Sequence, residues 1–125
     1  MDTPALVDRP DFDEGRKAFD AIKGASIPVD LAFWAYFSDS SEWRFVAVTS
    51  WLERRGPNET YTAIRRALRQ KDVKLPLRLV TVARPDEPLA RVGLNAAKVV
   101  HPFGTGQDWT VSTLNVTVNT KYIYR

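Results

Sequence analysis

The stretch VDLAFWAYFSDSSEWRFVAVTSWL, residues 29–52, contains the clearest secondary-structure pattern of the sequence. Every second residue from Val29 to Phe37 is apolar, and the stretch is rich in β-branched and aromatic side chains, which is typical of a strand. The opposite face carries Ala32, Trp34 and Tyr36, so we expect both sides of this strand to be covered. A polar turn at residues 38–41 precedes a second strand pattern from Trp43 to Leu52, which predicts an antiparallel hairpin.

The hairpin is followed by Gly56-Pro57, and this pair predicts the start of a helix that runs to about Gln70. Proline is tolerated at a first helical position because its missing N–H would have no partner there. At about 100° per residue, Tyr61, Ile64 and Leu68 fall on one face. We expect that face to meet the sheet.

The flanking sequence supplies the other predicted helices. Asp11 followed by Glu14 resembles a capping box at the start of a helix that ends at Gly24, with Phe19 and Ile22 inward. Asp86 is placed to cap a further helix. The inward face of that helix carries Leu89, Val92 and Ala96.

Three further strands complete the pattern, at residues 77–83, 109–114 and 117–124, with a loop at residues 101–108 before the last two. The order α-β-β-α-β-α-β-β predicts the α+β class, with about five strands in a mixed or antiparallel sheet and three helices packed on it. Residues 11–125 are expected to form this single domain. Residues 1–10, which carry two prolines, are expected to be a tail.

Composition excludes several functional classes. The chain has 125 residues, of which 44% are hydrophobic and 26% charged, as in an ordinary globular domain. It has no cysteine and one histidine, so thiolate nucleophiles, cysteine zinc sites and multi-histidine metal sites within one chain are excluded. The sequence shows neither a membrane span nor a secretory signal, which predicts a cytoplasmic protein.

Charge is divided unevenly along the chain. Nine acidic and four basic residues occur through Glu42, a net charge of −5, whereas 14 bases and 6 acids from Trp43 onward give +8. Such asymmetry indicates either a surface for nucleic acid or another acidic partner, or an acidic N-terminal part that folds over a basic face of the same chain.

The basic residues cluster around the helix after Gly56. Arg65, Arg66 and Arg69 form a stripe beside its inward face, and Arg54 and Arg55 lie in the predicted loop before it. Such an edge would bind several phosphates without sequence specificity, or another anionic partner. The alternative is an ordinary solvated face whose arginines lie over apolar neighbours and reach carboxylates on the first helix.

Other chemistry-bearing residues are few. Trp51 is a candidate stacking platform because it is close to Arg54 and Arg55, whereas Trp34 and Trp43 are expected in the core. His101, in a loop with Gly104 and Gly106, is the one candidate acid–base catalyst, although it has no nucleophile nearby in sequence.

No metal site or cofactor is predicted. The residues Phe-Gly-Thr-Gly at 103–106 lack the spacing of nucleotide-binding loops. The carboxylates of Asp11, Asp13 and Glu14 fit a helix N-terminus better than a calcium loop.

The segment EWRFVAVTSWLERRGPNETYTAIRRAL, residues 42–68, resembles a group of small bacterial proteins of uncharacterised function. In that group a strand of W-R-(apolar)-V type leads through a short polar stretch into a G-P-x-x-x-Y-x-x-I helix. The tyrosine-rich end, residues 121–125 (KYIYR), is also similar. The resemblance covers roughly residues 30–125 and implies the fold, but it implies no activity, cofactor or site residue.

We therefore expect a non-catalytic binding or interaction module. Its basic helix edge, with Trp51, would contact a partner protein, or an unprotected strand edge would pair with another copy of the chain. The alternative hypothesis is a nucleic-acid-binding protein or a small RNA-directed toxin or nuclease. In that case Arg65, Arg66 and Arg69 would contact phosphates and His101 would supply acid–base chemistry.

Overall fold

A computed structural model describes residues 10–99, 110–113 and 115–125. It contains three α-helices, one short 3₁₀ turn (η1) and one five-stranded sheet, in the predicted order. The elements are α2 (Phe12–Gly24), β1 (Leu31–Phe37), β2 (Glu42–Val48), α3 (Trp51–Gln70), η1 (Leu77–Leu79), β3 (Val80–Ala83), α4 (Pro88–Val99), β4 (Thr110–Thr113) and β5 (Val116–Tyr124). The predicted α+β class is confirmed.

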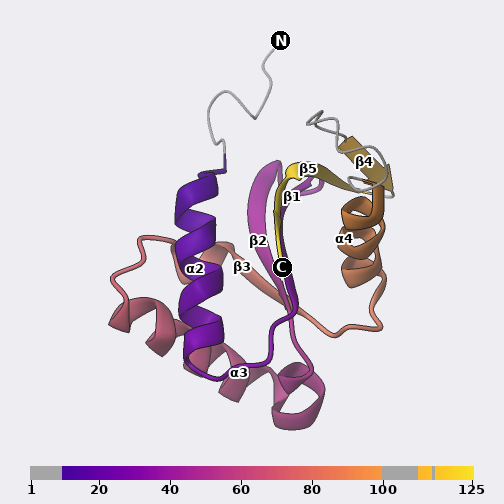
Figure 1. The fold of residues 1–125 in the computed structure, drawn as a ribbon. Coiled ribbons are helices and arrows are strands. Elements are labelled where there is room, and N and C mark those ends of the chain that lie inside the picture. Colours follow the sequence, from indigo (N-terminus) through magenta and orange to yellow (C-terminus); the bar gives the residue numbers. More distant parts are fainter. Residues whose placement is uncertain (1–9, 100–109, 114) are drawn as a thin grey trace.

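The sheet has the strand order β3-β2-β1-β5-β4 and is mixed. β2 and β3 are parallel and are connected through α3, whereas the other neighbouring pairs are antiparallel. Figure 1 shows α2 and α3 on one side of the sheet and α4 on the other. The predicted tail lies outside the described residues except for Pro10, which is buried.

Strand β1 runs through the middle of the sheet and contributes to both cores. Leu31, Phe33 and Ala35 are buried on the side of α4, and Ala32 and Trp34 are buried on the side of α2 and α3. This is the two-sided burial that the alternation in residues 29–37 predicts. The helix faces predicted to be inward are buried too, with Ile64 and Leu68 from α3 in one core and Ala96 from α4 in the other.

The predicted hairpin is confirmed, with Leu31 opposite Val48 and Phe37 opposite Glu42. The prediction of its second strand as far as Leu52 is wrong, because β2 ends at Val48 and Trp51 already belongs to α3. The reason is local. The buried Thr49 side chain accepts a hydrogen bond from the Trp51 N–H at 3.1 Å, and Ser50 adopts a helical backbone conformation, so the chain turns into a helix.

Helix α3 has a kink at the predicted helix start. Gly56 has φ 83° and ψ 165°, a conformation that glycine adopts without steric cost, and Pro57 begins the longer part of the helix. The Thr60 hydroxyl donates to the Gly56 carbonyl at 2.7 Å and so bridges the kink. Arg54 and Arg55 therefore lie on a separate helical turn. The prediction that they lie in a loop is wrong.

The N-terminus of α2 is capped as predicted by Asp11, whose carboxylate accepts from the Glu14 N–H at 3.0 Å. Glu14 itself accepts from the Lys74 backbone N–H, in the segment after α3. This acidic side chain therefore connects α2 to the neighbouring segment and does not close a capping box.

The other boundaries differ by a few residues from the prediction. Leu77–Leu79 form a 3₁₀ turn, so the third strand begins at Val80. The N-cap position of α4 is Glu87, not Asp86, and the Glu87 carboxylate accepts from the Arg84 N–H at 2.8 Å. The predicted loop at residues 101–108 lies outside the described residues.

The C-terminal Tyr124 is the side chain that fixes α2 to the sheet. It is fully buried, its ring stacks on Phe12 and Phe19, and its hydroxyl donates to the Phe12 carbonyl at 2.9 Å. Burial, which the neighbouring Trp34 indole offsets only in part, raises the pKa of the Tyr124 phenol above its usual range.

A Gly15→Ala substitution is expected to destabilise the fold. A Cβ at residue 15 would overlap with the Tyr124 hydroxyl and would lie 2.6 Å from Trp34 Nε1, so α2 would have to move from the sheet. We expect the free energy of unfolding, measured in urea, to fall by about 1–3 kcal/mol. Gly24→Ala is the matched control, because a Cβ there meets no atom within 4 Å. Equal stabilities of the two variants would contradict this packing.

The buried phenol also predicts a pH dependence. Because the folded chain holds Tyr124 neutral, the unfolded chain loses this proton first, so the contribution of Tyr124 to stability is constant below about pH 10 and is lost as the pH rises above it. Urea unfolding from about pH 8 upward should show a smaller fall in Tyr124→Phe than in the wild type. Parallel curves would mean that the phenol ionises equally well in both states.

Candidate nucleic-acid or protein interface on helix α3

All five predicted binding arginines lie on α3 and are exposed, and the Gly56 kink divides them into two groups. Arg54 and Arg55 precede the kink together with Trp51. Arg65, Arg66 and Arg69 follow it. His101, the candidate catalyst, lies outside the described residues. The predicted site residues therefore do not converge on one point but occupy two parts of one helix.

The ring of Trp51 is half-buried, and Arg55 of the same helix covers it. The Arg55 guanidinium lies 4.1 Å from the centre of the Trp51 ring, and Arg55 also pairs with Glu59 at 2.9 Å. Trp51 contacts the core on the α2 and α3 side of the sheet. The structure thus gives this aromatic ring packing contacts within the chain, and a base could stack on it only after Arg55 moves.

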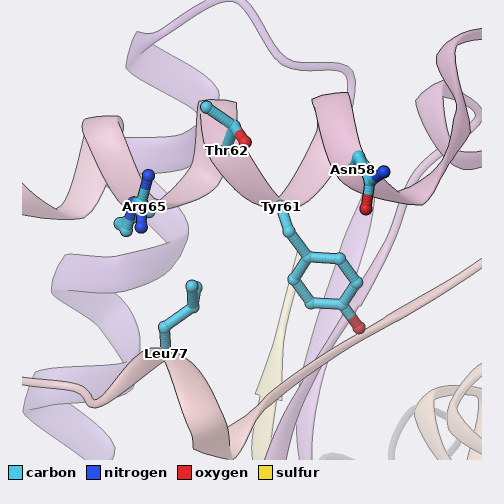
Figure 2. A pocket seen from close by; sticks show the side chains of 5 residues that line it. All are labelled: Asn58, Tyr61, Thr62, Arg65 and Leu77. Atoms are coloured by element: carbon cyan, nitrogen blue, oxygen red, sulfur yellow. The ribbon is translucent and has the colours of Figure 1, made fainter.

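The second group borders a groove between α3 and the segment that leads to β3. Two adjoining hollows of about 250 Å³ each share Arg65 and Leu77. We call this surface the α3 groove. Figure 2 shows its first hollow. Tyr61 is directed down from the helix, and Leu77 is directed up toward the helix from the chain below. Its lining consists of Asn58, Tyr61, Thr62, Arg65, Leu68, Arg69, Val73, Leu75 and Leu77.

The charges of the α3 groove are not neutralised by the chain. Within the part of the chain that the structure describes, neither Arg65 nor Arg69 forms an ion pair or a hydrogen bond through its side chain. Residues 51–79 carry eight basic and three acidic side chains. Arg66 is also exposed and unpaired among the described residues, but it does not line the groove.

These observations correct one interpretation of the basic stripe. The sequence left open that the arginines reach carboxylates on the first helix. In the described residues the Glu14 carboxylate of α2 instead contacts Lys17 and the Lys74 backbone, and no α2 carboxylate pairs with Arg65, Arg66 or Arg69. Self-shielding by α2 therefore does not explain these arginines.

The floor of the α3 groove also closes the free edge of the sheet at β3. The Val82 N–H, which points away from β2, donates to the Tyr61 hydroxyl at 2.9 Å. The Val80 N–H, which points the same way, donates to the Leu77 carbonyl of η1. Both outward donors of β3 are thus satisfied within the chain, which leaves this strand fewer free N–H groups for pairing with a second copy.

The sequence indicated Tyr61 only as an inward residue. Its hydroxyl contact with β3 has no sequence signal, because the partner is a backbone amide 21 residues away. Leu77 was expected to belong to a strand and instead lines the groove from the 3₁₀ turn. The apolar wall of the groove was therefore missed.

Other possible sites are less developed. A third hollow, at the ends of β2 and β3, is lined mainly by apolar side chains such as Leu31, Val48 and the exposed Leu94. No group of three or more metal-ligating side chains occurs in residues 10–99, 110–113 and 115–125. No helix in these ranges is long and apolar enough to cross a membrane.

Comparison with known proteins adds no relative: no protein-family model matches the chain, and neither a curated protein nor a solved structure shows significant similarity to it. The residues and geometry of the α3 groove are therefore the basis for a function.

Tyr61→Phe tests the closure of the β3 edge. Loss of the hydroxyl leaves the Val82 N–H without its partner, and we expect a loss of about 1–3 kcal/mol in the free energy of unfolding and faster hydrogen exchange of the Val82 amide. Tyr36→Phe is the control, since this half-buried hydroxyl has no hydrogen-bond partner within the described residues. Unchanged exchange at Val82 in Tyr61→Phe would show that the contact does not protect the edge.

Proposed function

We propose that this protein is a cytoplasmic binding module whose α3 groove holds an acidic segment of a partner protein. The observation that carries the proposal is the pair of exposed, unpaired guanidinium groups of Arg65 and Arg69 beside the apolar side chains of Val73, Leu75 and Leu77. Such a surface matches a ligand that is both anionic and apolar. No catalytic group or cofactor is needed for this function.

The free energies of the two kinds of contact favour a ligand that makes both ionic and apolar contacts over one that makes ionic contacts alone. An exposed ion pair contributes only about 0–1 kcal/mol, because water and salt screen it. Each apolar side chain of the partner that is buried in the groove would add about 1.5–3 kcal/mol. The arginines would thus determine which partners are attracted, and the apolar wall would supply much of the affinity.

A nucleic-acid ligand is the second candidate. It is favoured by Arg54 and Arg66, which lie outside the groove and are also exposed and unpaired among the described residues. Phosphates would contact this wider basic surface, with affinity that falls steeply as salt rises. On this hypothesis the protein is a nucleic-acid-binding protein or a small RNA-directed toxin or nuclease, with His101 as its candidate catalyst.

Arg66 distinguishes the two candidates. For a partner held in the groove, labelled poly-glutamate should bind in low salt, and the double variant Arg65→Gln/Arg69→Gln should weaken binding by about three- to thirtyfold, since it removes two exposed ion pairs of up to about 1 kcal/mol each. Arg66→Gln should leave it nearly unchanged. Fluorescence anisotropy measures the affinity of poly-glutamate for the wild type and for both variants, and thermal unfolding checks that each protein is folded.

The same variants should behave differently with nucleic acid. If labelled single-stranded oligonucleotides bind more tightly than poly-glutamate, and Arg66→Gln weakens them as much as either groove substitution does, the second candidate is the correct one. If neither these polyanions nor a peptide with both glutamate and leucine residues binds at low salt, the α3 arginines have no anionic ligand and the proposed function is wrong.

A further inference from the structure

The geometry of the α3 groove points to the form of its ligand. Resting on the proposed function, we infer that the groove binds an extended peptide of about five residues in which acidic and apolar side chains alternate. Three features of the groove indicate this ligand: its length, the spacing of its two arginines and the apolar character of its opposite wall.

The length follows from the helix residues that line the groove. They run from Asn58 to Arg69 on one face of α3, which corresponds to about 16 Å along the helix axis at 1.5 Å per residue. An extended chain rises about 3.3 Å per residue, so about five residues cover this length. Hollows of about 250 Å³ suit side chains better than a second helix, which is about 10–12 Å across.

The spacing of the arginines favours acidic residues at alternate positions. Arg65 and Arg69 are one helical turn apart, a rise of about 6 Å. Residues i and i+2 of an extended peptide point to the same side and are about 6.6–6.8 Å apart. Two carboxylates in an acidic-x-acidic sequence would therefore reach both guanidinium groups at once, whereas adjacent acidic residues would point to opposite sides.

The opposite wall provides the apolar half of the pattern. From residue 73 to 77 every second side chain lines the groove, namely Val73, Leu75 and Leu77, while Lys74 and Pro76 between them are exposed. The residue between two carboxylates points away from α3 in an extended peptide, and so toward this wall. An apolar side chain at that position would contact Leu75 and Leu77.

The apolar wall at residues 73–77 and the arginines of α3 come from different parts of the chain, yet they are fixed relative to one another. Leu75 is buried in the core, and the adjacent Lys74 backbone N–H donates to Glu14 of α2. Tyr61, from the same helix face as Arg65, is fixed to β3 through Val82. Much of the groove is therefore pre-formed, which reduces the ordering cost of binding.

The test compares two labelled peptides of identical composition, Glu-Leu-Glu-Leu-Glu and Glu-Glu-Leu-Leu-Glu, by fluorescence anisotropy at low salt; the second has no two acidic residues at positions i and i+2. We expect the alternating peptide to bind at least about fivefold more tightly, since only its carboxylates and leucines face opposite walls. Arg65→Gln/Arg69→Gln and Leu77→Ala should each abolish this preference. Arg66→Gln and Leu94→Ala, exposed residues outside the groove, are the matched controls and should retain it.

Failure of this inference is distinguishable from failure of the proposed function. Equal affinities of the two peptides, with binding of poly-glutamate still dependent on Arg65 and Arg69, would overturn the alternating register and leave the binding function intact. A preference that survives Arg65→Gln/Arg69→Gln would place the peptide elsewhere and would also overturn the inference. If oligonucleotides alone bind, or if neither peptide, nor poly-glutamate, nor an oligonucleotide binds, both the inference and the proposed function are overturned.

Discussion

Strand β1 is buried on both of its faces, and this burial dictates how the other elements are arranged. Because Phe33 and Trp34 are both buried while their side chains point in opposite directions, helices must cover both sides of the sheet. The hairpin partner β2 and the C-terminal β5 pair with β1 on its two edges and share this burial. α3 lies where it does because it connects β2 to the parallel β3 along one covered face.

This constraint links the core to the candidate site through one helix. The inward side of α3 buries Ile64 and Leu68, and Tyr61 reaches from the same helix to the edge of the sheet. Arg65 and Arg69 lie beside this inward side, at the border between packed and exposed surface. Their position is thus set by packing that is needed for stability in any case. The guanidinium groups remain available because no described carboxylate faces them.

The sequence predicted well those features that depend on local periodicity. Alternation in residues 29–37, the polar turn after it and the 3.6-residue pattern around Ile64 each reflect which side of an element is buried, and these signals are carried by neighbouring residues. The arginine stripe was predicted for the same reason. The start of α3 was misplaced because Trp51 and Leu52 continue an apolar pattern, while the turn into the helix depends on one side-chain hydrogen bond from Thr49.

Features that depend on contacts between distant segments had no comparable signal. The segment from Val73 to Leu77 has an alternating pattern that fits a strand as well as a groove wall, and only its position beside α3 distinguishes the two. Its position is set by Glu14 on the Lys74 backbone and by the burial of Leu75, both of which require the folded α2 and α3. A sequence can therefore identify a basic helix face, but the apolar wall beside this face becomes visible only when the sheet places the next segment against it. In this protein the charge of the candidate site is a local property, and its apolar wall is a tertiary one.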